Sequence, residues 1–246
     1  MNPTADASAE FLAAAKIIGE ALIKGGADAW STMTGTELTH HMGEARMDTP
    51  VALAENWKSA LVTRVAWSGD RNGALYLLLE EEGGKVIVAH MMALMMGGAP
   101  DEAATALDEE GMDAYIEAAN NFIGQGSQAL REALKQSVKL SVEFTRRVDM
   151  PAQAAEIFGD APLVTQSGTF TMKGGAPHTV AVWMEAACAG VESDSTSVKE
   201  SESGARGGSK KAYSRDATPF LPENMAHALK LSIPLIVVLA EKKMRM

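Results

Sequence analysis

The chain has 246 residues, of which 46% are hydrophobic and 22% charged, a composition typical of a globular protein long enough to bury a full core. Its 32 acidic residues outnumber its 22 lysines and arginines, and the net charge of -10 opposes binding to nucleic acids and to anionic membrane surfaces. We therefore expect no nucleic-acid partner.

The first part of the chain has a helical pattern followed by strand patterns. Apolar residues at helical spacing predict a long helix over residues 10–30, broken or loosened near Gly25. Two short β-prone runs, 60–67 and 74–79, flank a turn-rich segment and predict a hairpin. Residues 85–89 form either the end of a strand or the start of a helix.

Four methionines follow within residues 90–96, at positions 91, 92, 95 and 96. Pairs four residues apart would cover one side of a short amphipathic helix. Methionine commonly fills irregular gaps in cores, so this pattern favours a core or subunit contact over a ligand-binding methionine surface.

A second long helix is predicted from near Asp113 to about Gln136. Gly124 and Gly126 lie inside it, and each costs roughly 1 kcal/mol of helix propensity relative to alanine. Close packing against another backbone would explain their presence.

Three strands are predicted after this helix, over residues 138–148, 164–172 and 179–184, with a turn at 173–175. The order of helix, strands and hairpin thus occurs twice. Residues 26–30 can be laid over 126–130 at an offset of 100 residues, which suggests two structural halves. We place this domain at residues 5–190.

The composition changes abruptly after residue 190. Residues 191–220 are rich in serine, glycine and charge with almost no apolar periodicity, which is typical of a flexible linker. In residues 221–246, a short helix and an apolar strand pattern at 229–239 follow, and these cannot form a core without a partner or further sequence.

A polar stripe marks the second long helix. Asp113, Glu117 and Asn120 stand at i, i+4 and i+7, so they face the same way. Such a stripe is either an ordinary exposed helix face or a surface that enters the active site of another protein. Two successive asparagines, Asn120 and Asn121, have poor helix propensity, which favours a role beyond helix stability.

The spacing Asp113-x3-Glu117-x2-Asn120, with Gly124 four residues later and the duplicated order of elements, resembles the CheC, CheX and FliY family of chemotaxis phosphatases over residues 11–188. Residues 228–241 resemble the opening of the flagellar switch domain shared by FliN and FliY. The resemblance implies an α/β (α+β) fold: a CheC-like pseudo-two-fold domain with an antiparallel sheet and long helices, then a linker and an incomplete switch domain.

Three features differ from the family's pattern. Glu143 occupies the position of a family proline, and the nearest later proline is Pro151. Ile17 and Glu20 stand 100 residues before Glu117 and Asn120, so at most one active site is expected. The response-regulator-binding peptide that FliY proteins carry at their start is not recognisable in residues 1–10.

The resemblance implies the dephosphorylation of a phosphorylated CheY-like response regulator. Asn120 would orient the attacking water and Glu117 would pair with a lysine of the regulator. Asp113 would support this pair, or would only interact with the helix dipole. The regulator would supply magnesium and the phosphorylated aspartate, so the chain needs no metal or cofactor of its own.

Two alternatives remain open at this point. The domain could be a non-catalytic structural subunit of the flagellar switch complex, or a stand-alone chemotaxis protein with a vestigial tail. The partners implied are the phosphorylated regulator and the switch proteins FliM, FliN and FliG.

The location expected is cytoplasmic, with the flagellar basal body as one candidate place. The single cysteine, Cys188, excludes an internal disulfide and fits a reducing compartment. The apolar run 233–240 is far shorter than the roughly 20 residues of a membrane span, so no direct membrane insertion is expected.

Three further residues that could carry chemistry have simpler interpretations. His40 and His41 are neighbours that point apart, which favours solvent exposure over metal binding. Ser127 lacks evident histidine and acid partners for a nucleophile. Cys188 is expected to be a buried small residue.

Overall fold

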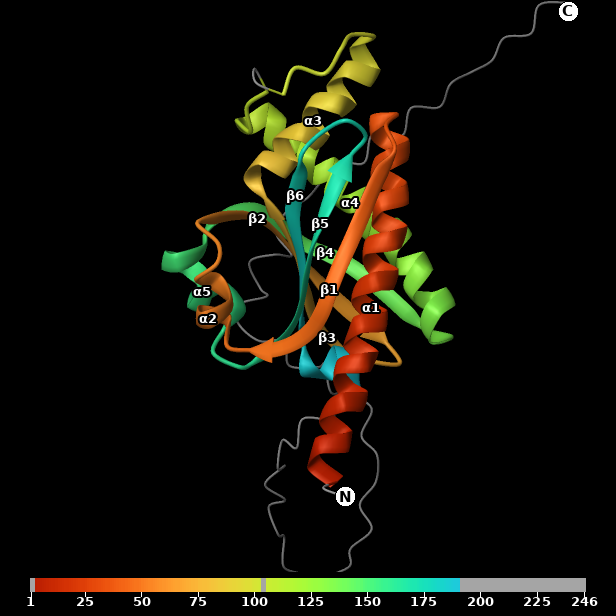
Figure 1. The fold of residues 1–246 in the computed structure, drawn as a ribbon, viewed down its shortest axis with the longest axis vertical. Helices are drawn as coiled ribbons and strands as arrows, with labels where there is room; N and C mark the ends of the chain where they lie inside the picture. The colour runs from red at the N-terminus through yellow and green to blue at the C-terminus, as the bar shows by residue number, and fades with distance from the viewer. Residues whose placement is uncertain (1–2, 103–104, 191–246) are drawn as a thin grey trace, which may run out of the picture. The chain divides into compact units, whose positions relative to one another are not determined.

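The computed structural model describes residues 3–102 and 105–190, which form helices interspersed with antiparallel strands (Figure 1). In chain order they are α1 (Pro3–Thr34), β1 (Leu38–Asp48), α2 (Pro50–Ala54), β2 (Ser59–Gly69), β3 (Gly73–Glu80), α3 (Glu81–Met96), α4 (Glu109–Leu134), β4 (Val138–Asp149), α5 (Met150–Phe158), β5 (Leu163–Met172), β6 (Pro177–Glu185) and the short 3-10 helix η1 (Ala186–Ala189).

The six strands form one antiparallel sheet in the order β1-β5-β6-β3-β2-β4. Exchanging β1 with β4, β2 with β5 and β3 with β6 reverses this order and leaves the sheet unchanged. The two halves of the domain are therefore related by a pseudo-two-fold axis through the central β3–β6 pair. This arrangement confirms the predicted fold class and the two structural halves.

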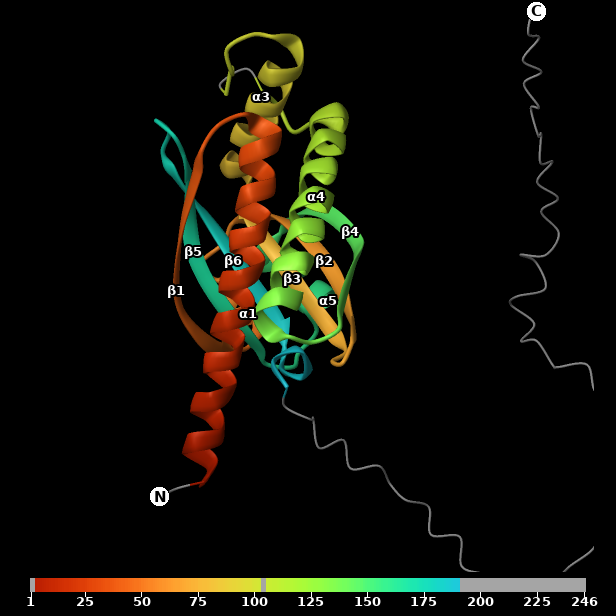
Figure 2. The same ribbon diagram turned by 90° about the vertical axis from the view of Figure 1, so that its right-hand side faces the viewer.

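Two apolar layers enclose the sheet. The long helices α1 and α4 lie side by side over one face (Figure 2), and the short helices α2 and α5 pack against the other. Neighbouring residues of the central strand β3 point into different layers: Leu77 packs under the long helices and Leu78 under the short ones. Both faces of β3 are buried, which explains why its sequence is a continuous run of apolar residues.

The two long helices repeat one burial pattern at the predicted offset. Residues 11–20 and 111–120 have the same order of buried, half-buried and exposed positions. Ala15 and Tyr115 are both fully buried, for example, and Ile18 and Ala118 face the same core. The offset of 100 residues therefore describes the α1 and α4 pair correctly.

Helix α1 runs without interruption through Gly25, so the predicted break is wrong. The glycines lie where α1 crosses α4: a Cβ on Gly25 would stand 2.8 Å from the carbonyl oxygen of Gln125, and a Cβ on Gly26 would overlap the ring of Phe122. The absence of a side chain allows this close contact, and tertiary packing offsets the lost helix propensity.

Gly126 makes the corresponding contact from α4. A Cβ there would lie 3.0 Å from the carbonyl oxygen of Leu22, which confirms the predicted close approach of another backbone. For Gly124 that explanation is wrong, because no atom of another described element lies within 4 Å of its Cβ position. A buried hydrogen bond of 3.0 Å from Trp30 Nε1 to the carbonyl oxygen of Ala118 also joins the two helices.

The predicted hairpin corresponds to β2 and β3, and the three later strand predictions correspond to β4, β5 and β6. Residues 85–89 belong to helix α3, which settles the alternative left open by the sequence. Strand β1 was not predicted. It is an edge strand in which only Leu38 is buried, so it lacks the apolar alternation that marks a strand.

The four methionines of α3 divide into two groups. Met91 is buried in the core and Met92 is half-buried, as the core prediction requires. Met95 and Met96, at the end of the helix, are 84% and 74% exposed, so the core prediction is wrong for them. For this second pair a subunit contact stays a prediction, and a ligand-binding methionine surface stays its alternative.

Glu143, which occupies the position of the family's proline, forms an ion pair within the sheet. Glu143 lies on β4 and pairs with Arg64 of β2 at 3.1 Å. Pro151 lies in the first turn of α5, as Pro50 does in α2, and proline is well suited to a first turn because the missing N–H needs no partner there.

The linker and switch-domain predictions for residues 191–246 lie outside the described residues.

Cys188 is buried, as predicted, and its Sγ lies 3.5 Å from the carbonyl oxygen of Ala74. Burial, and then the nearby Glu185 carboxylate, raise the pKa of its thiol to about 12. We expect iodoacetamide to label the native chain at pH 8 roughly a hundredfold or more slowly than the urea-unfolded chain, because the thiolate is the reactive form.

The same shift predicts a pH dependence of stability. The pKa of the thiol in the folded chain is raised above its ordinary value of 9.0. Its contribution to the free energy of unfolding is therefore complete below pH 9 and is lost as the pH rises through about 12.

For the iodoacetamide experiment, a Cys188→Ser variant is the control, because the slow labelling must disappear when the thiol is removed. Equal labelling rates in the native and unfolded chains would contradict the buried position.

Candidate functional site

Helix α4 begins four residues before the predicted start. Asp108 is its N-cap, and the side chain accepts a hydrogen bond of 3.1 Å from the Gly111 N–H. Glu109 and Glu110 occupy the first turn, where carboxylates interact best with the helix dipole. Asp113 lies beyond that turn, so the purely dipolar role considered for it has less support.

The polar stripe lies on the solvent-exposed face of α4. Asp113, Glu117 and Asn120 are all exposed, whereas Tyr115 and Phe122 on the opposite face are buried in the core. The tertiary structure therefore places the three predicted residues together on one accessible surface. Their helical spacing predicted that they share one face, and the family resemblance made them the candidate site.

Glu117 and Asn120 have side chains without polar partners in the described part of the chain. Within residues 3–102 and 105–190, no hydrogen bond or ion pair engages either side chain. The neighbouring Asn121 differs, because its Nδ2 donates a hydrogen bond of 3.1 Å to the carbonyl oxygen of Glu117. One asparagine of the pair is thus bound to its own helix, and the other is available to a partner molecule.

The equivalent face of α1 does not repeat the stripe. Ile17, at 49% exposure, takes the place of Glu117, and Glu20 takes the place of Asn120. Next to them, Lys16 forms an ion pair of 2.7 Å with Glu44 of β1. The α1 face therefore has no acid followed three residues later by an amide, which is the arrangement on α4.

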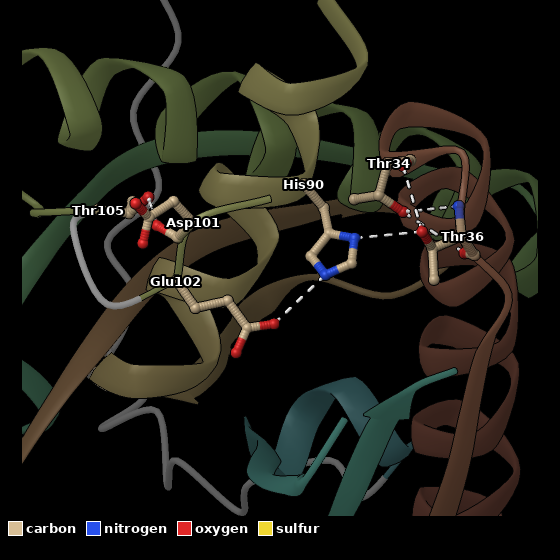
Figure 3. Close-up of polar contacts among 6 residues, drawn as sticks. All are labelled: Thr34, Thr36, His90, Asp101, Glu102 and Thr105. Atoms are coloured by element: carbon tan, nitrogen blue, oxygen red, sulfur yellow. Dashed lines mark hydrogen bonds and ion pairs between the residues drawn. The ribbon is translucent and has the colours of Figure 1, made fainter. Parts of the chain in front are cut away.

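A second polar cluster, which the sequence did not reveal, surrounds His90 of α3 (Figure 3). Its Nδ1 lies 3.1 Å from Thr36 Oγ1, and its Nε2 lies 3.3 Å from Glu102 Oε1. The imidazole is only 13% exposed and connects α3 both to the turn after α1 and to the loop after α3. Since both ring nitrogens have partners, this cluster is best described as a tertiary contact.

The remaining candidate residues behave as the sequence indicated. His40 and His41 are exposed on β1. Ser127 is buried, and its Oγ accepts a hydrogen bond of 3.2 Å from Arg131 Nη2. In the described part of the chain, no group of three or more histidine, cysteine, aspartate or glutamate side chains is arranged to hold a metal ion.

None of the helices in the described ranges is both long enough and apolar enough to cross a lipid bilayer.

No protein-family model matches the sequence, and no curated protein matches it. Solved structures match its fold. FliY from Thermotoga maritima is 18% identical, with a TM-score of 0.58 over 68% of this chain and 87% of that chain. The FliM middle domain from H. pylori is 8% identical, with a TM-score of 0.52 over 71% of this chain and 91% of that chain.

A chain of the FliG-FliM complex from H. pylori is 11% identical, with a TM-score of 0.53 over 71% of this chain and 92% of that chain. These identities are low, so the likeness concerns the fold. The chain therefore has the fold of FliY and of the FliM middle domain, which confirms at the level of the fold the resemblance drawn from its sequence.

Proposed function

We propose that this protein works in bacterial chemotaxis at the flagellar motor switch, in the cytoplasm. The proposal is supported by the fold shared with FliY and the FliM middle domain. The solved FliG-FliM complex among the matching structures makes FliG and FliM candidate partners. FliN is a further candidate, implied by the sequence resemblance. The resemblance of residues 228–241 to a switch domain adds a separate argument from the sequence.

Its activity in this proposal is the dephosphorylation of a phosphorylated CheY-like response regulator. The observation that carries the proposal is the exposed pair Glu117 and Asn120 on the solvent face of α4, whose side chains bind no other described residue through a hydrogen bond or ion pair. An aspartyl phosphate already has a good leaving group, so a phosphatase has mainly to place a water in line with the phosphorus. An exposed helix can insert such a pair into the regulator's active site.

The two side chains have different roles. The Asn120 amide oxygen accepts a hydrogen bond from the attacking water and orients it. The Glu117 carboxylate pairs with a lysine of the regulator and thereby places Asn120 against the phosphoryl group. Asp113, one turn earlier, adds negative charge toward the same lysine. The regulator contributes the phosphorylated aspartate and its magnesium ion.

A non-catalytic role is the second candidate. Two of the three matching structures described above contain FliM, and Ile17 on α1 shows that one half of this domain lacks the acid and amide pair. In this alternative the domain is a structural subunit of the switch complex, and the stripe on α4 docks a regulator without hydrolysing its phosphate.

The decay of a radiolabelled phosphorylated CheY-like regulator from the same organism tests the choice. We expect the full chain to accelerate the decay in proportion to its concentration, because each encounter supplies a positioned water. Unchanged decay together with retained binding to the switch proteins would favour the structural role. A boiled sample of the chain controls for effects of added protein.

A further inference from the structure

A hollow of about 300 Å³ lies between the C-terminal half of α1 and the middle of α4, beside the polar stripe. It is lined by residues of both helices: Asp28, Ala29, Thr32, Met33, Asn121 and Gln125. Because α1 and α4 pack side by side, residues almost 100 positions apart in the sequence form its two walls.

The rim of the hollow is polar and presents hydrogen-bond acceptors. Asp28 contributes a carboxylate, and Thr32 donates its hydroxyl proton to the Asp28 carbonyl oxygen at 2.9 Å, which leaves the hydroxyl lone pairs as acceptors. Asn121 uses its Nδ2 on the Glu117 carbonyl oxygen, so its Oδ1 remains available. Among the residues that line this hollow in the described chain, none is lysine, arginine or histidine.

The floor of the hollow is apolar. Ala29 is buried and Met33 is half-buried, whereas Asp28, Thr32 and Asn121 are exposed at the rim. An apolar floor below an acceptor-rich, negatively charged rim suits a lysine or arginine side chain, whose aliphatic stem packs on carbon while its cationic end binds oxygen. The net charge of -10 of the chain favours a cation as well.

The hollow lies next to the candidate site through Asn121, which lines it. Asn121 follows Asn120 in the chain, and its side chain is bound to the backbone of Glu117. A cation in the hollow would therefore lie on the same protein surface as the two site residues. Two separate charge contacts, one at Glu117 and one at Asp28, would fix the rotation of a partner about α4 as well as its position.

We propose that this hollow binds a second cationic side chain of the phosphorylated regulator, with Asp28 as its counter-charge. The inference rests on the proposed function, and it makes Asp28 a positioning residue that sets affinity and specificity. Asp28 does not touch the phosphoryl group. Its contribution is expected in KM and in the dissociation constant, with kcat unchanged.

The test compares the full-length wild type, Asp28→Asn and Glu20→Gln. The Glu20 substitution is the matched control, because it removes the same charge from an exposed position of α1 outside the hollow. Two quantities are measured: the dissociation constant for the beryllofluoride-activated regulator, and the kinetics of decay of the radiolabelled regulator.

We expect Asp28→Asn to raise the dissociation constant and KM about tenfold, with kcat unchanged, and Glu20→Gln to change neither by more than about twofold. The loss should shrink as the salt concentration rises, since salt screens the contact in the wild type. If wild type and Asp28→Asn bind the regulator with the same affinity, the inference is overturned. In that case the proposed function still stands, provided that the wild type accelerates the decay of the regulator.

If the wild type binds the regulator without accelerating its decay, the proposed phosphatase activity fails, and weaker binding by Asp28→Asn still supports the hollow. If the wild type does not bind the regulator, both proposals are wrong. A loss of kcat in Asp28→Asn would also overturn the positioning role.

Discussion

Asn120→Ala is expected to lower the rate of phosphate loss from the regulator by roughly a hundredfold relative to wild type, close to the spontaneous rate. The amide is exposed and makes no hydrogen bond or ion pair within the described residues, so its removal should leave the fold unchanged. The expected loss is in kcat, because the amide acts on the water in the transition state.

The same assay separates Asn120 from Glu117. Glu117→Ala is expected to weaken binding of the regulator as well as catalysis, because the carboxylate pairs with a lysine of the partner. The matched control is Gln128→Ala, which removes an exposed amide from the same helix two turns later and should retain full activity. Full activity of Asn120→Ala would show that the site is elsewhere.

Gly126→Leu is expected to lower the free energy of unfolding by about 3 kcal/mol, which corresponds to a melting temperature lower by roughly 6–12 °C. A Cβ at this position would already lie 2.6 Å from Leu22 Cδ1 and 3.0 Å from the Leu22 carbonyl oxygen. The carbonyl is backbone, so the larger side chain must push α4 away from α1 and loosen the core between them.

Gly124→Leu is the matched control, two residues away on the same helix. Among the described residues, no neighbouring element comes within 4 Å of its Cβ position, so leucine should raise stability by roughly 0.5–1 kcal/mol through better helix propensity. Thermal unfolding of the full chain, followed by circular dichroism at 222 nm, measures both variants. Similar effects of the two substitutions would mean that the α1–α4 contact is less close than described.

Local patterns carried most of the fold prediction. Helix α4, with its stripe of Asp113, Glu117 and Asn120, could be predicted because helical periodicity alone separates its buried face from its exposed face. The hairpin β2–β3 could be predicted for a similar reason, since buried strands are rich in apolar residues and a turn joins them.

Other elements could not be predicted because their determinants are not local. Strand β1 has few buried side chains, and its backbone hydrogen bonds to β5, more than 100 residues later, define it as a strand. Gly25 and Gly26, in the C-terminal half of α1, weaken a helix in isolation, and the opposing surface of α4 makes them favourable.

The amino-acid sequence by itself determined which residues are the candidates: one acid and amide pair, on one face of one helix, in one half of a duplicated domain. Only the tertiary structure decided what surrounds that pair. The antiparallel sheet brings α1 against α4, and this contact places Asp28 beside Asn121 across a shared hollow. The physical reason is that periodicity records which face of a helix avoids water, whereas the neighbours of that face depend on packing between segments distant in the chain.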